Sequence, residues 1–185
     1  MDLFPTSINW TADGHIYFTA LDRGAQLVYR SDPATQKTER VVVGKRSVVS
    51  PDLNDAQRKL VYVASDSQHP SELFVADLNG RDEKQLTHHN DDYLAQVATQ
   101  ATQDFTWKSV DDWSIQGFLI KPVGWQAGRK YPMVLNIHGG PNGMWGYQWC
   151  SDCQLYAAQG WGVLMINPRG SSGYGMNFQR GVAGE

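Results

Sequence analysis

The residues best placed to do chemistry are a His-Gly-Gly-Pro tetrapeptide at positions 138–141. It follows an apolar, β-prone run at 133–137, which we expect to be a strand buried on both faces, as in a parallel sheet. Glycines at a strand's carboxyl end let backbone N–H groups approach a ligand and stabilise the charge that develops on a carbonyl oxygen during acyl transfer. Pro141 has no N–H, so the donor would be a glycine or a later residue. Alternatively, the glycines only permit a tight turn.

A second loop favours the functional interpretation. Residues 167–175, Asn-Pro-Arg-Gly-Ser-Ser-Gly-Tyr-Gly, follow another apolar run at 162–166. Between the two runs, residues 151–159 are helix-like, and Gly160 is expected to end that helix. A strand, a helix and a second strand form a βαβ unit with a right-handed crossover. Both loops are therefore expected at the edge of a parallel sheet where the ligand sites of α/β proteins gather.

The first part of the chain contains an internal repeat. Two β-prone segments recur at offsets of 45 and 46 residues, and each repeat opens with a turn signal: segments 16–20 and 27–32 match 61–64 and 73–77, and the turns are at 12–14 and 50–52. A period of this length, built from short strands, is typical of β-propeller blades. The chain has room for two of the roughly four to eight blades that a propeller needs. A small β-sandwich is the alternative.

The composition changes near residue 104. Residues 1–104 carry 10 Lys and Arg against 15 Asp and Glu, whereas residues 105–185 carry 6 against 4 and hold six of the seven Trp. Beyond this point, β-prone segments at 105–110 and 115–120 form a predicted hairpin, and the βαβ pattern follows. We therefore expect two structural units that meet near residue 104.

Composition also limits the function classes. The net charge of −3 is too small and too mixed to favour nucleic acid or an anionic membrane as a partner, and the apolar runs are too short to span a bilayer. Cys150 and Cys153 form a single C-x-x-C pair, interpreted as two residues on one face of the first helical turn rather than a zinc site. The polar run 88–92, His-His-Asn-Asp-Asp, is interpreted as a solvated loop. No metal or other cofactor is predicted.

These features together resemble the prolyl oligopeptidase family of serine peptidases, in its acylaminoacyl-peptidase and dipeptidyl-peptidase branch. The resemblance rests on the repeat, the segment 117–122, the tetrapeptide 138–141 and the loop 167–175. It implies a β-propeller followed by an α/β-hydrolase domain, a Ser, Asp and His triad, short peptides as substrates and no cofactor. Gly140 would then donate the oxyanion-hole N–H from a loop shared with Gly139, Arg169 would shape the rim of the sheet, and Asn142 is a candidate substrate-binding residue.

The sequence departs from this family in one respect. The family's nucleophile lies in a Gly-x-Ser-x-Gly elbow, and residues 1–185 contain none, because Tyr174 stands where Gly170-Ser171-Ser172-Gly173 would need its final glycine. The acid and the histidine follow the serine in this fold, so the whole triad is expected outside this chain. His138 precedes that position, so a structural hydrogen-bonding role is predicted for it.

The resulting prediction is a fragment of a serine peptidase, inactive by itself. Residues 1–104 would form the last blades of a propeller plus a linker, and residues 105–185 the start of an α/β-hydrolase domain that ends before the nucleophile. A carboxylesterase and a non-catalytic propeller module that binds a partner are the alternatives. An oligomer is compatible with the sequence, as is either a cytoplasmic or an exported location.

Overall fold

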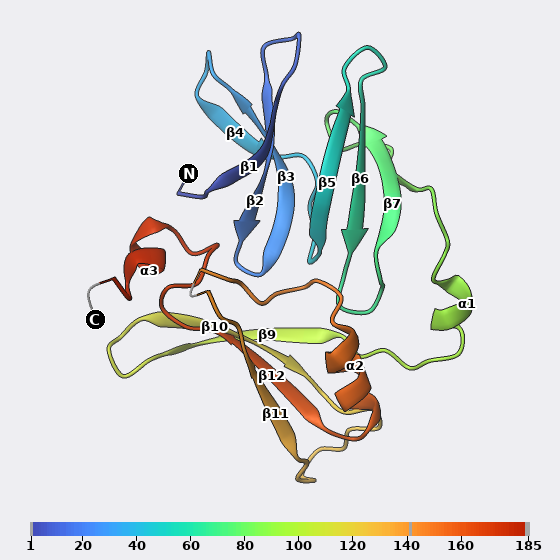
Figure 1. Ribbon diagram of the computed structural model, residues 1–185, viewed down its shortest axis with the longest axis vertical. Helices are drawn as coiled ribbons and strands as arrows, with labels where there is room; N and C mark the ends of the chain where they lie inside the picture. The colour runs from blue at the N-terminus through green and yellow to red at the C-terminus, as the bar shows by residue number, and fades with distance from the viewer. Residues whose placement is uncertain (1, 141, 184–185) are drawn as a thin grey trace.

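The computed structural model describes residues 2–140 and 142–183, and it contains two sheets, one above the other in Figure 1. The upper sheet consists of two antiparallel four-stranded units in chain order. Their strands are β1 (Pro5–Trp10), β2 (Ile16–Asp22), β3 (Ala25–Asp32) and β4 (Lys37–Arg40), then β5 (Ser47–Asn54), β6 (Lys59–Ser65), β7 (Glu72–Asp77) and β8 (Lys84–Gln85). A parallel pairing of Gln26 with Ser47 joins the two units.

The sequence repeat corresponds to equivalent strands of these units. The matched segments are β2 with β6 and β3 with β7, each the second and third strand of its unit. The predicted turn at 50–52 is wrong, because these residues lie inside β5. Instead, the register of β5 shifts between Val49 and Asp52, and Ser50 adopts φ 48°. Such a bulge accommodates Pro51, which cannot donate to a regular ladder.

Apolar side chains of both units meet in one core. It is formed by buried residues of β2, β3, β5, β6 and β7 and of the following loops, among them Tyr17, Val28, Leu60, Tyr62 and Leu78. The Tyr17 hydroxyl, inside this core, donates a hydrogen bond to the Leu78 carbonyl oxygen at 3.0 Å. The two units therefore pack as one body despite the single bridging pair of strands.

The lower sheet contains the predicted hairpin and βαβ unit. Its order is β11 (Met133–Ile137), β12 (Gly162–Asn167), β10 (Ser114–Ile120) and β9 (Thr102–Lys108), with β11 and β12 parallel and the other pairs antiparallel. Helix α2 (Ser151–Ala158) connects β11 to β12, and Gly160 follows its end at φ +84°. Two short helices, α1 (Asp91–Leu94) and α3 (Met176–Arg180), lie in the connection between the sheets and after β12 (Figure 1).

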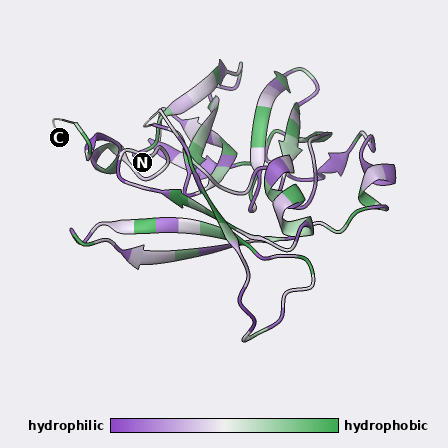
Figure 2. Ribbon diagram, turned by 60° about the horizontal axis from the view of Figure 1, so that its bottom comes forward, coloured by the Kyte–Doolittle hydropathy of each residue, from purple (hydrophilic) through white to green (hydrophobic). Residues whose placement is uncertain are grey.

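A second core joins the two sheets. Buried residues of β2 and β3 pack with buried residues of β10, β12 and α2; they include Phe18, Leu27, Phe118, Ala157 and Met165. Figure 2 shows apolar residues interspersed with polar ones along the strands of both sheets. This pattern agrees with strands that bury one face and expose the other.

Strand β11 differs from its prediction. Its outward residues Met133, Leu135 and Ile137 are 57%, 52% and 59% exposed, not buried. β11 is an edge strand, and its outward face is left open by the described part of the chain. The apolar run correctly predicts a strand, but its second covering layer is not among residues 2–140 and 142–183. None of the described helices is long and apolar enough to cross a membrane.

Candidate active-site loops

The loops that follow β11 and β12 lie together at one edge of the lower sheet, as predicted. Asn167, the fully buried last residue of β12, holds them with its side-chain amide. Its Oδ1 accepts from the Trp145 N–H at 2.8 Å, and its Nδ2 donates to the Trp145 carbonyl oxygen at 2.8 Å. Nδ2 also donates to the Tyr174 hydroxyl at 2.7 Å. A buried amide with all these partners fixes the spacing of the two loops.

His138 connects the same two loops. Its Nε2 lies 2.9 Å from the Oγ of Ser171, and that hydroxyl donates to the Pro168 carbonyl oxygen at 2.7 Å. The predicted structural role of His138 is therefore confirmed. The Ser–His distance resembles that of a nucleophile and its base, but Ser171 is fully buried and its proton is already donated to a carbonyl. Ser171 therefore does not serve as a nucleophile.

Further contacts bind the tetrapeptide's loop to its neighbour. The Ser172 N–H donates to the Gly143 carbonyl oxygen at 2.9 Å, and the Ser172 hydroxyl donates to the carbonyl oxygen of Asn142. A Cβ on Gly143 would lie 2.8 Å from Nδ1 of His138, so only glycine fits there. The loop is thus held on the side that faces residues 168–172.

The predicted oxyanion residues lie on the open side of this loop. Gly139, Gly140 and Asn142 are exposed, and Gly140 has φ +127°, in the region that favours glycine. None of the hydrogen bonds within residues 2–140 and 142–183 uses the N–H of Gly139 or Gly140. Pro141 lies outside the described residues. Among the described residues, the loop therefore has backbone N–H groups without a partner at the carboxyl end of β11.

Arg169 connects this edge of the sheet to the β9–β10 turn. Its Nε lies 3.1 Å from Oδ2 of Asp111. A hydrogen bond from Ser109 and, secondarily, the charge of Arg169 lower the pKa of Asp111, so this carboxylate is ionised at neutral pH. The contact is at the rim of the sheet, where sequence reasoning expected Arg169.

The cysteine pair occupies the first turn of α2, as predicted, but the two residues form a disulfide. Cys150 is the N-cap and accepts from the Cys153 N–H through its sulfur at 3.3 Å. The spacing C-x-x-C was the signal for this bond. Elsewhere in the described chain no three His, Cys, Asp or Glu side chains gather as a metal site. His88 lies 3.1 Å from Asp91, in the exposed segment that begins α1.

Sequence reasoning missed one element of this site, the β2–β3 turn. The Arg23 N–H donates to the Gly173 carbonyl oxygen at 3.0 Å, so the turn of the upper sheet contacts the loop that follows β12. Arg23 itself adopts φ 48°. The only sequence signal was an Arg-Gly pair between two strands, which predicts a turn but not its distant partner.

Comparisons with known proteins find relatives in sequence and in fold. No family model matches the chain. An uncharacterized peptidase of Bacillus subtilis, YuxL, is 31% identical over 95% of the chain, and dipeptidyl-peptidase 5 of Trichophyton equinum is 27% identical over 96%. The structure of an acylaminoacyl peptidase from Pyrococcus horikoshii is 30% identical, covers 98% of the chain and has a TM-score of 0.85. Dipeptidyl peptidase 4 of Porphyromonas gingivalis shares the fold, with a TM-score of 0.78 at 16% identity over 97% of the chain.

The chain spans about a quarter of each of these proteins: 27% of YuxL, 25% of the Trichophyton enzyme, 28% of the Pyrococcus enzyme and 26% of the Porphyromonas enzyme. Its two sheets align with them over almost its whole length. The chain is thus related, in sequence and in fold, to a segment of about a quarter of the length of acylaminoacyl and dipeptidyl peptidases, which are members of the prolyl oligopeptidase family of serine peptidases.

Proposed function

We propose that residues 1–185 are part of a serine peptidase that hydrolyses short peptides by acyl transfer. The observation that carries this proposal is the exposed Gly140, whose N–H has no hydrogen-bond partner among residues 2–140 and 142–183, on a loop held in place by His138 and Asn167. A donor that is fixed before the reaction stabilises the tetrahedral oxyanion without reorganisation. Removing one such donor costs about 2.7 to 4 kcal/mol of transition-state stabilisation.

In this proposal the chain supplies the oxyanion site and the reactive groups come from outside residues 1–185. A serine attacks the substrate carbonyl, the Gly140 N–H binds the resulting oxyanion, and the acyl-enzyme is then hydrolysed by water. Asn142, exposed on the same loop, would contact the substrate next to the scissile bond. The relatives support peptides as substrates, since one acylaminoacyl peptidase structure holds the peptide derivative Z-Gly-Gly-Phe-chloromethyl ketone.

The same proposal assigns the two structural units. Residues 1–104 would be the last blades of a β-propeller plus a linker, supported by two successive four-stranded antiparallel units. Residues 105–185 would begin an α/β-hydrolase domain, supported by the parallel pair β11 and β12 with α2 between them. Because the second core joins both sheets, the blades would directly support the oxyanion loop.

Amide and ester substrates test this proposal. The polypeptide encoded by the complete reading frame that contains residues 1–185 is assayed on N-acyl-aminoacyl and dipeptidyl p-nitroanilides and on p-nitrophenyl esters. The proposal predicts hydrolysis of the anilides that a fluorophosphonate blocks. Hydrolysis of the esters alone would instead support a carboxylesterase.

A further inference from the structure

A cavity of about 550 Å³ lies between the two sheets, beside the candidate active-site loops. Its walls come from the β2–β3 turn, β9, β10, α3 and the loops after β11 and β12, and they include Arg23, Asp104, Gln116, Tyr147, Tyr174 and Asn177. This volume is within the range of small-molecule sites, roughly 300 to 1,000 Å³. Nothing in the sequence indicated this cavity, because its lining residues come from parts of the chain that are far apart in sequence.

One charged group of this cavity is unpaired. Within residues 2–140 and 142–183, the Arg23 side chain forms no hydrogen bond or ion pair. The one carboxylate of the lining, Asp104, is balanced by Lys45, whose Nζ lies 2.6 Å from its Oδ1. The two phenols, Tyr147 and Tyr174, are neutral because burial raises the pKa of each. The cavity therefore has an unbalanced positive charge at Arg23.

The remaining walls provide a fixed polar surface and an aromatic one. Tyr174 accepts from Asn167 Nδ2 at 2.7 Å and donates to Gln116 Oε1 at 2.7 Å, so its hydroxyl is held rigidly. Phe178 packs against Trp113 with ring centroids 5.6 Å apart and against Tyr174 at 5.0 Å. The side chain of Asn177 is exposed, and it forms no hydrogen bond with any other described residue. An apolar side chain of a ligand could contact the rings of Phe178 and Trp113, and a peptide group could form hydrogen bonds with Asn177.

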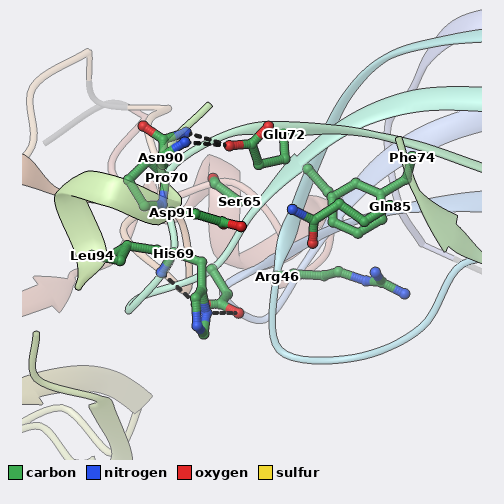
Figure 3. Close-up of a pocket in the computed structure, with 12 residues that line it drawn as sticks. Arg46, Ser65, His69, Pro70, Glu72, Phe74, Gln85, Asn90, Asp91 and Leu94 are labelled. Atoms are coloured by element: carbon green, nitrogen blue, oxygen red, sulfur yellow. Dashed lines mark hydrogen bonds and ion pairs between the residues drawn. The ribbon is translucent and has the colours of Figure 1, made fainter. Parts of the chain in front are cut away.

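A second cavity, of about 280 Å³ beside α1, lacks these properties (Figure 3). Glu72 accepts from the Asn90 N–H at 2.9 Å and from its Nδ2 at 2.7 Å, and Asp66 lies 2.9 Å from Nδ1 of His69. Arg46 donates twice to Glu83, at 3.0 and 2.8 Å. Because Glu72, Asp66 and Arg46 each already have a polar or charged partner, none of them is left to select a charged ligand.

We infer that the inter-sheet cavity binds the C-terminal carboxylate of a short peptide whose last side chain is apolar, with Arg23 as the partner of the carboxylate. A guanidinium binds a carboxylate through two parallel hydrogen bonds, which a terminal amide does not match. The rings of Trp113 and Phe178 would contact the last side chain, and Asn177 the preceding peptide group. The choice of a peptide over another carboxylic acid rests on the proposed function.

Binding of a defined peptide tests the inference. Calorimetric titration of the 185-residue chain uses acetyl-Ala-Ala-Phe as the free acid, its C-terminal amide and N-acetylphenylalanine. We expect the free-acid tripeptide to bind about tenfold or more tightly than its amide, and more tightly than N-acetylphenylalanine. Arg23→Ala should abolish the preference for the acid, and Arg23→Lys should keep part of it. Arg81→Ala, which removes an exposed arginine on the β7–β8 turn, should leave it unchanged.

Three results would overturn the inference: no saturable binding, equal affinity for acid and amide, or an Arg23→Ala chain that keeps the preference. Equal affinity for the tripeptide and N-acetylphenylalanine would overturn the assignment to peptides. The titration measures binding and not hydrolysis. The predicted binding can therefore be observed even if the proposed peptidase activity is absent, and the activity can be observed even if the predicted binding is absent.

Discussion

The carbonyl oxygen of Gly24 accepts a hydrogen bond from the backbone N–H of Tyr147 at 2.8 Å. This contact joins the β2–β3 turn of the upper sheet to the segment that continues the candidate oxyanion loop. The two backbone segments approach so closely that a Cβ on Gly146 would lie 1.8 Å from the Gly24 carbonyl oxygen. The position of the loop in the lower sheet therefore depends on a turn in the upper sheet.

Replacing Gly24 should disrupt this contact. Gly24 has φ +87°, and a Cβ there would lie 2.3 Å from Cζ of the buried Phe118. Gly24→Ala should lower the free energy of unfolding by about 2 to 5 kcal/mol, from the left-handed backbone and from overpacking together. Urea denaturation followed by tryptophan fluorescence measures the change.

Gly14→Ala is the matched control for Gly24→Ala. Gly14 has φ +86° in the β1–β2 turn, and its Cβ would meet nothing within 4 Å. This variant should lose only the backbone contribution of about 1 to 2 kcal/mol. Equal losses in the two variants would show that the approach of the sheets at Gly24 contributes nothing.

Ser171 should matter for stability and not as a nucleophile. Ser171→Ala removes the hydroxyl that contacts Nε2 of His138 and one of the two donors to the Pro168 carbonyl oxygen, whose other donor is the backbone N–H of residue 171. We expect a loss of about 1 to 3 kcal/mol in the free energy of unfolding. Ser71→Ala, at an exposed serine, should change it by less than about 0.5 kcal/mol. A neutral Ser171→Ala variant would contradict the described loop contacts.

The stability of the upper sheet should depend on pH through Glu72. Burial opposes ionisation, but hydrogen bonds from Thr87 and Asn90 outweigh it and lower the pKa of Glu72 to about 2. A carboxyl with a lowered pKa in the folded state stabilises the fold fully above its ordinary pKa of about 4.5. That contribution is lost as the pH falls from about 4.5 towards 2.

The difference in stability between the unmodified chain and Glu72→Gln measures this contribution. It should be constant near neutral pH and should shrink between about pH 4.5 and 2. Asp92→Asn, at an exposed carboxyl in α1, should show no such convergence. A difference that stays the same down to pH 2 would mean that Glu72 is not specifically stabilised in its ionised form.

The open face of the lower sheet should bind apolar dyes. Leu135 and Ile137 of β11, with Phe105 of β9, are 52%, 59% and 42% exposed on strands of one sheet. We expect the 185-residue chain to enhance anilinonaphthalene sulfonate fluorescence, and the double variant Leu135→Glu, Ile137→Glu to reduce it several-fold. Val110→Glu, at a fully exposed turn residue, should leave the signal unchanged. No enhancement in the unmodified chain would contradict the exposure of this face.

Local patterns predicted most of the elements. Apolar runs predicted β11 and β12, Gly160 predicted the end of α2, and the repeat predicted that Tyr17 and Tyr62 occupy equivalent strands. These features depend on neighbouring residues, so the sequence expresses them directly. The HGGP and NPRG loops were predicted to share an edge because parallel strands align their carboxyl ends.

Features that depend on distant contacts were not predicted. The exposure of Leu135 depends on which layers cover the sheet, and the contact of Gly24 with Tyr147 depends on how the two sheets pack. Pro51 was interpreted as a turn signal. Its actual setting, a bulge in β5, is defined by the pairing of β5 with β6, which the local sequence does not show. The roles of Gly139, Gly140 and Asn142 are still predictions.

The most direct test of this account is to locate the serine that a fluorophosphonate labels. The 185-residue chain and the product of the complete reading frame are each incubated with the reagent and with an N-acyl-aminoacyl p-nitroanilide, then digested and analysed by mass spectrometry. The account predicts no turnover and no adduct on the 185-residue chain, and one adduct on the longer product at a serine outside residues 1–185. Turnover by the 185-residue chain, with an adduct on Ser171 or another of its serines, would contradict it.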